Sequence, residues 1–223
     1  MPDLAPLWLS LALAGVTTVV LLILGTPLAW WLAHTSSRIR PVIEAITALP
    51  LVLPPTVLGF YFLIILGPGT TIGNFWVQVT GDALTFSFSG LVVASVVYSL
   101  PFMVQPLQSA FESMGRAPLE AAATLRASPL DAFFSVAVPL SRHGFVTAAV
   151  LTFAHTIGEF GVVLMVGGNI PGKTRVISIA IYEHVETLNY AAAHWLSAVL
   201  LVFAFTVLFL VYALKRRLAI RVG

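Results

Sequence analysis

The sequence has no cysteine among its 223 residues, which excludes a disulfide framework, a thiol nucleophile and a cysteine metal site. Charge is also scarce: 9% of the residues are charged, against about 25% in a soluble domain. Hydrophobic residues make up 59% of the chain. The scarcity of charge therefore excludes an ordinary soluble domain and indicates a membrane protein.

Long apolar runs are plentiful, and roughly 20 apolar residues suffice to cross a hydrocarbon core of about 30 Å. The first run lacks the basic region that precedes a secretory signal and is longer than a signal's apolar core, so we expect it to be retained. We predict an all-α integral membrane protein, a single domain over residues 1–223 with about five transmembrane helices. The predicted spans are residues 7–33, 46–67, 88–107, 145–166 and 192–214.

The orientation of the chain follows from its basic residues, because Lys and Arg near helix ends stay cytoplasmic. Of the 11 basic residues, the nine that follow spans 1, 3 and 5 fall on one side: Arg38, Arg40, Arg116, Arg126, Arg142, Lys215, Arg216, Arg217 and Arg221. This bias predicts an N-terminus outside and a C-terminus in the cytoplasm. No basic patch with interleaved aromatic residues suggests a nucleic-acid partner.

Prolines interrupt the second and third predicted spans, at Pro50, Pro54 and Pro55 and at Pro101 and Pro106. Proline removes a backbone donor and kinks a helix. Inside a membrane, such breaks persist where protein or a water-filled cavity satisfies the freed carbonyls. We expect both spans to be broken there and name Pro54, Pro55 and Pro101 as pathway candidates. The alternative is that proline is simply common in membrane helices.

Glu159 is the only acid inside a predicted span, and such a residue is a functional candidate by default. His155 lies four residues earlier on the same helical face. Two ligands are too few for a metal site, so we predict none. We expect a structural role for Glu159, with its carboxylate hydrogen-bonded to broken backbone or to a neighbouring helix.

A polar segment separates spans 3 and 4, at about residues 112–142. Ser128 is suited to cap a second helix there, with Pro129 at its first position and Asp131 in its first turn. That helix, residues 130–138, carries an apolar stripe formed by Leu130, Phe133, Phe134 and Ala137. The stripe could bind a partner or pack against the chain's own spans, and the pattern alone leaves both open.

Residues 167–174 read Gly-Gly-Asn-Ile-Pro-Gly-Lys-Thr and match the phosphate-loop pattern of nucleotide-binding proteins. Charge bias places this segment outside, Pro171 removes one amide, and no aspartate follows Asp131 to hold Mg²⁺. A P-loop NTPase is therefore a poor alternative. We instead expect an external loop at about residues 167–190 whose Asn169, Lys173 and Arg175 meet a binding protein or a passing anion.

The polar segment resembles the EAA loop of ABC-transporter permeases, which reads Glu-Ala-Ala, three residues, Gly, nine residues, then a branched apolar residue, any residue, Leu and Pro. The match falls on Glu120-Ala121-Ala122, Arg126, Val136, Val138 and Pro139, with Arg126 where the family has glycine. The resemblance implies that residues 119–124, including Leu119 and Thr124, form a coupling helix that sits in a cleft of an ATPase.

Further stretches resemble the molybdate ABC-transporter permeases over nearly the whole chain, and sulfate permeases more loosely. They are residues 53–61, 86–90 and 98–102, Gly158-Glu159-Phe160-Gly161 and residues 168–174. The resemblance implies a type I ABC importer permease fold in a bacterial or archaeal plasma (inner) membrane. It also implies a second copy of the chain, two cytoplasmic ABC ATPases that bind ATP and Mg, and an external oxyanion-binding protein. This chain would bind no cofactor and would not be an enzyme.

The function that we predict is transport of molybdate by alternating access, with tungstate or sulfate as alternative substrates. A passive anion channel is the rival of a different class, but it would have no use for the segment around Glu120. Because the spans contain neither Arg nor Lys, we expect neutral donors to hold the oxyanion. Thr56, Ser99 and Thr152 are the candidates.

Overall fold

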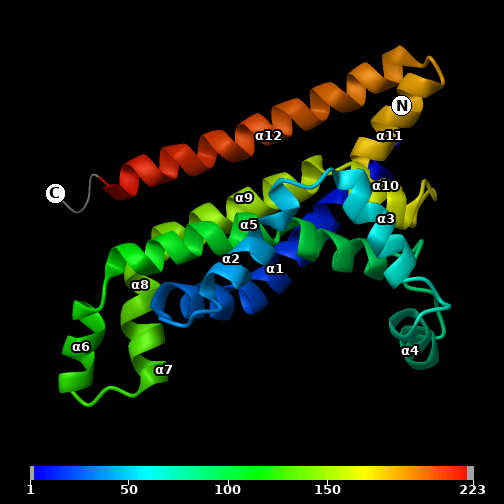
Figure 1. Ribbon diagram of the computed structural model, residues 1–223. Coiled ribbons are helices and arrows are strands. Elements are labelled where there is room, and N and C mark those ends of the chain that lie inside the picture. Colours follow the sequence, from blue (N-terminus) through cyan, green and yellow to red (C-terminus); the bar gives the residue numbers. More distant parts are fainter. Residues whose placement is uncertain (1–2, 220–223) are drawn as a thin grey trace.

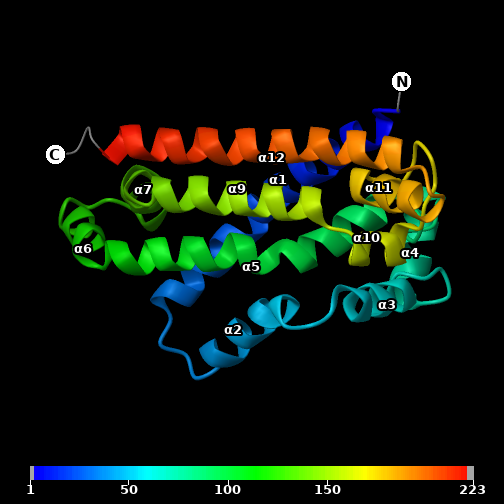
Figure 2. The ribbon, with the colours of Figure 1, turned by 90° about the horizontal axis from the view of Figure 1, so that it is seen from above.

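Three long helices run lengthwise through the molecule in both views of the computed structural model (Figures 1 and 2). They are α1 (Ala5–His34), α5 (Phe88–Met114) and α12 (Tyr190–Ala219), and each is long and apolar enough to cross a membrane. The structure describes the backbone of residues 3–219 and the side chains of residues 3–209. Over that range there is no strand. The basic cluster of residues 215–221, used above for orientation, lies outside the described side chains.

Two bent helix pairs raise the number of candidate spans to as many as five, if each pair is counted as one span. In the first, α2 (Arg40–Ala48) and η1 (Leu49–Leu51) meet α3 (Pro55–Ile65) at 107°. In the second, the segment Pro129–Leu140 meets α9 (Arg142–Gly158) at 74°. The chain breaks again after α9, at Glu159 and Phe160, before α10 (Gly161–Gly167). Helices thus cover all five predicted spans, and the second and the fourth of them are divided.

Prolines break only one of the two spans in which we expected breaks. Pro54 has an extended backbone (φ −55°, ψ 136°) and separates η1 from α3. By contrast, α5 continues through both Pro101 and Pro106, so the expectation for the third span was wrong. This helix is packed between α1 and α9, and proline is tolerated in a membrane helix where neighbouring helices surround it.

The main core forms where α1, α5 and α9 meet. Leu21 and Leu32 of α1 pack with Met103 and Leu107 of α5, and all four are fully buried. A second cluster joins α5 to α10 and includes Ala94 and Val162. These contacts make α5 the central helix. By contrast, α12 lies against α9 and α11 (Ile177–Glu186) and remains largely exposed.

The shorter helices gather at the two ends of the bundle (Figure 1). One end carries α6 (Ala117–Thr124), α7 (Pro129–Ala132), the single π-helical turn η2 (Phe133–Ala137) and α8 (Val138–Leu140). The opposite end carries α11 and α4 (Thr71–Thr80). The polar segment between spans 3 and 4 therefore projects beyond the long helices, and the 167–190 segment lies at the far end from it.

Candidate functional site

The projecting segment opens with α6, which holds five of the residues predicted to couple this chain to an ATPase. Glu120, Ala121 and Thr124 are exposed and Leu119 is half-buried, whereas Ala122 is buried. The helix packs on η2 through its inner side. Glu120 lies in the first turn, where the helix dipole favours a carboxylate. The outward face of α6 is therefore open to a partner.

Helix α6 ends in a Schellman motif built around Arg126. The Ala127 N–H donates to the Ala122 carbonyl at 3.1 Å, and the Arg126 N–H donates to the Ala123 carbonyl at 3.0 Å. Arg126 has a φ of +62°, the left-handed conformation that usually selects glycine at this position. The backbone thus keeps the turn that the family glycine would favour, and the exposed guanidinium of arginine is added to it.

The predicted cap of the next helix is confirmed, because the Ser128 hydroxyl accepts a hydrogen bond from the Asp131 N–H at 3.2 Å. The apolar stripe packs only in part against the chain's own spans. Phe133 packs on Trp30 and Phe111, while Leu130 and Phe134 are 72% and 65% exposed. Of the other residues, Ala137 is buried and Pro139 lies exposed in α8.

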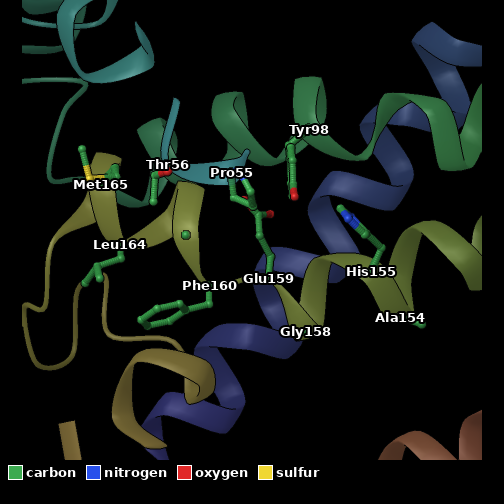
Figure 3. Close-up of a pocket in the computed structure, with 11 residues that line it drawn as sticks. Pro55, Thr56, Tyr98, Ala154, His155, Gly158, Glu159, Phe160, Leu164 and Met165 are labelled. Carbon is green, nitrogen blue, oxygen red and sulfur yellow. The ribbon is translucent and has the colours of Figure 1, made fainter. Parts of the chain in front are cut away.

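A cavity of about 570 Å³ lies where the broken spans meet α5. Figure 3 shows Glu159 and His155 pointing toward Tyr98 of α5, with Pro55 and Thr56 of α3 beside them. The rest of its wall is Ala154, Gly158, Phe160, Gly161, Leu164 and Met165.

Two glycines let α3 and α10 approach each other beside this cavity. A Cβ on Gly59 would lie 2.6 Å from the Met165 Cβ, and one on Gly161 would lie 2.7 Å from the Pro55 Cβ. Real Cβ atoms essentially never come this close, so a larger residue at either position would push the two helices apart. The close contact places the start of α3 next to the break that follows α9.

Glu159 links three elements at that break. Its Oε2 accepts a hydrogen bond from the Ser95 hydroxyl of α5 at 3.1 Å, and its backbone carbonyl accepts one from the Ser178 hydroxyl of α11 at 2.5 Å. The residue is 5% exposed, and Oε1 has no hydrogen-bond partner within the described part of the chain. The carboxyl group is therefore bonded to a neighbouring helix through one oxygen, while its other oxygen is buried without a partner in the described part of the chain.

The other polar residues of the spans lie at different depths. Ser99 is fully buried, and its hydroxyl lies 2.9 Å from His155 Nδ1 and 3.0 Å from Thr156 Oγ1. Thr152 is also fully buried and lies off the cavity wall, as does Pro101. Of the three candidate donors, Thr56 alone lines the cavity. Ser99 and Thr152 sit behind it within the protomer.

At the opposite end, the glycine-rich loop forms a compact polar network. Arg175 Nε donates to Asn169 Oδ1 at 2.6 Å, Arg175 Nη2 lies 3.1 Å from Glu183 Oε2, and Asn169 Nδ2 donates to that same oxygen. Lys173 is exposed. Thr174 is buried, and its hydroxyl donates to the Gly167 carbonyl at 2.7 Å. This hydroxyl is used inside the loop, whereas a phosphate loop would need it for Mg²⁺.

Sequence reasoning missed Ser95 and Tyr98 as neighbours of Glu159. A signal for Ser95 was present, because it lies four residues before Ser99 on the same face of α5 and both are small polar residues in an apolar helix. Tyr98 carries no such signal. Its place at the cavity depends on how α5 is rotated against α9.

Comparisons with known proteins agree on one family. Residues 25–222 match the family model described as "Binding-protein-dependent transport system inner membrane component". The chain is 60% identical over 214 residues to the molybdenum transport system permease protein ModB of Azotobacter vinelandii, covering 96% of this chain and 95% of that protein. It is 33% identical to the putative molybdenum transport system permease protein YvgM of Bacillus subtilis, with coverages of 94% and 92%. A bacterial alginate ABC transporter solved with its periplasmic protein has a TM-score of 0.75 at 16% identity, covering 96% of this chain and 78% of that chain.

Proposed function

Because this chain belongs to the family of binding-protein-dependent transport system inner membrane components, we propose that it is the membrane-spanning permease subunit of an ATP-driven importer of molybdate. Its fold is that of type I ABC importer permeases, and it is a multi-pass protein of the inner membrane. The names of its similar relatives support molybdate over sulfate or tungstate.

The observation that carries the proposal is the continuous connection between the projecting segment and the cavity. Helix α5 has 27 residues and is therefore about 40 Å long. Ser95, which binds Glu159, lies near its start, and α6 follows two residues after its end. A displacement of α6 at one end of α5 would therefore also move the opposite end of α5, where Ser95 lies beside the cavity. The broken spans α2–η1–α3 and α9–α10 provide the joints on which the cavity walls can shift.

The proposed assembly contains a second copy of this chain, two cytoplasmic ABC ATPases and an external oxyanion-binding protein. ATP and Mg would bind to the ATPases and not to this chain. The exposed face of α6 supports an ATPase contact, and the Asn169, Arg175 and Glu183 network at the opposite end supports a polar contact with the binding protein. The basic residues support an N-terminus outside and a C-terminus in the cytoplasm.

The cavity suits transient passage of an oxyanion better than tight binding. Its polar groups are the Thr56 and Tyr98 hydroxyls, His155 and the Glu159 carboxyl, and no Lys or Arg lines it. Hydroxyl donors can exchange hydrogen bonds with the four oxygens of molybdate, while a site without a fixed cation would not retain the anion. The oxyanion would thus be held tightly by the external binding protein and loosely by this chain.

The test is oxyanion uptake into proteoliposomes that contain this chain with its ATPase and binding protein. Glu120→Arg places a cation on the exposed face of α6, and Asp82→Arg is the matched control, since Asp82 is exposed at the opposite end. We expect Glu120→Arg to abolish uptake and substrate-stimulated ATP hydrolysis, and Asp82→Arg to retain both. Uptake that continues without ATP would mean a channel and would refute the proposal.

A further inference from the structure

Helix α4 lies across the direction of the spanning helices. It is seen along its axis in Figure 1, whereas α1, α5, α9 and α12 are seen lengthwise in both Figures 1 and 2. It is at the end of the bundle opposite α6 and α7. Because the long helices cross the membrane, the axis of α4 is parallel to the membrane plane.

Local contacts close the corner between α3 and α4. The Thr70 hydroxyl accepts from the Gly73 N–H at 3.0 Å and lies 2.7 Å from the Ile65 carbonyl. A Cβ on Gly73 would lie 2.0 Å from the Gly67 carbonyl oxygen, so the start of α4 is in direct backbone contact with the turn. Trp76 packs on the core cluster that contains Leu66. These contacts join the start of α4 to the end of α3.

The exposed surface of α4 is divided into two faces. Ile72, Phe75 and Val79 are 53%, 66% and 67% exposed and share one side at helical spacing. Asn74 and Gln78 form a separate exposed side and are hydrogen-bonded to each other at 3.2 Å. No Lys, Arg, Asp or Glu occurs from residue 71 to residue 80. The helix thus has an apolar face, a polar face and a packed side.

We propose that α4 lies in the membrane–water interface, with Ile72, Phe75 and Val79 in the boundary between headgroups and acyl chains, and that this contact fixes the depth of α3. Interfacial helices are recognised by this division into apolar and polar faces in the plane of the membrane. The occupant is the lipid itself, because α4 follows the apolar surface of a span after only the short turn 66–70: Ile64 and Ile65 at the end of α3 are 51% and 44% exposed. A helix without cations has no preference for anionic lipid.

This placement gives the two halves of the first broken span different attachments. Helix α3 is held at its far end by the lipid contact of α4. Helix α2 is joined to α3 through the extended segment around Pro54 and is bound to α5 by the Arg40–Glu112 and Gln108–Glu44 hydrogen bonds. During transport α2 would therefore follow α5, the span would bend at Pro54, and the depth of α4 would stay constant.

Site-directed spin labelling tests the proposal directly, because the chain has no cysteine to remove. Single cysteines at Phe75 and Val79 report on the apolar face, and cysteines at Asn74 and Gln78 are matched controls one turn apart on the polar face. In proteoliposomes of the whole transporter, we expect labels at Phe75 and Val79 to be reached more readily by oxygen than by an aqueous nickel chelate. Labels at Asn74 and Gln78 should show the opposite ratio, and the ratios should be insensitive to the fraction of anionic lipid.

Three outcomes would overturn the proposal. Labels at Phe75 and Val79 that the nickel chelate reaches, and that the binding protein then shields, would identify a protein-docking face. Labels shielded from both reagents would mean that a second copy covers α4. Oxygen ratios that change between the resting and the vanadate-trapped transporter would refute the fixed depth of α3. None of these outcomes would affect the permease function itself, which the Glu120→Arg experiment tests separately.

Discussion

Replacing Arg126 separates the two consequences of having an arginine where the family has glycine. The residue has a left-handed backbone, and the Schellman motif that follows α6 depends on that conformation. Arg126→Gly removes both the backbone strain and the charge. Arg126→Ala removes the charge and keeps the strain. The two variants therefore form a matched pair.

The expected magnitude follows from the backbone alone. A left-handed conformation costs an L-residue about 1–2 kcal/mol, which glycine avoids. The greater conformational freedom of glycine in the opened loop reduces this gain by about 0.5–1 kcal/mol. The net gain from Arg126→Gly is then about 0.75 kcal/mol at the midpoints of these ranges. Since about 1.4 kcal/mol corresponds to a factor of ten, the loop should open roughly two- to fivefold less often.

Hydrogen exchange measured by mass spectrometry on the peptide that contains Ala127 reports this opening, because the Ala127 amide closes the motif onto the Ala122 carbonyl. We expect exchange to slow roughly two- to fivefold in Arg126→Gly and to remain within error of the parent in Arg126→Ala. Equal slowing in both variants would show that the charge, and not the left-handed backbone, opens the loop. Unchanged exchange in Arg126→Gly would mean that the turn carries no strain.

Two more predictions concern the contacts inside the spans. Glu159→Ala leaves the buried Ser95 hydroxyl without its acceptor, which costs about 1–3 kcal/mol. It should therefore lower oxyanion uptake more than Glu159→Gln does. A change in the molybdate-to-sulfate preference measured in either variant would contradict a structural role. Gly144→Ala would place a Cβ 2.3 Å from the Ala110 Cβ and should lower the thermal stability of the detergent-solubilised chain by about 1–3 kcal/mol through overpacking of α5 against α9. Adding Ala110→Gly should restore most of that loss, and an equal loss in the double variant would exclude the close contact as its cause.

The features that the sequence predicts well are those that depend on neighbouring residues. The spans follow from the lengths of apolar runs, and the cap at Ser128 follows from three residues within one turn, Ser128, Pro129 and Asp131. The helical break at Glu159 and Phe160 was missed, because no proline marks it and glycine is common in membrane helices. At the break the Glu159 carbonyl accepts a tertiary hydrogen bond from the Ser178 hydroxyl of α11, whereas in a continuous helix it would accept from the backbone N–H four residues later.

The residues of the site likewise divide into those that the sequence predicts and those that depend on tertiary packing. A role for Glu159 was predictable because a lone acid in a span needs a partner, but Ser95 lies 64 residues away in sequence and only the packing of α5 on the α9–α10 break makes it that partner. Thr56 and Ser99 are equally plausible donors in sequence. The structure separates them, since Thr56 faces the cavity while Ser99 is bonded to His155 and Thr156 behind it.

Continuity of the helices determines where this protein can move. Neither α1 nor α5 is interrupted, although Pro27, Pro101 and Pro106 lie inside them, and their contact forms the main core. Apart from Tyr98 of α5, the residues that line the cavity belong instead to the segments next to the interruptions at Pro54 and at Glu159. A displacement of α6 would move α5 as one continuous helix, and the resulting change in shape would occur at these breaks. Hinges are short segments in which a few residues absorb the change in backbone angles. The position of a proline is thus a weak guide to motion, because α5 continues through Pro101 and Pro106 whereas the break at Glu159 contains no proline.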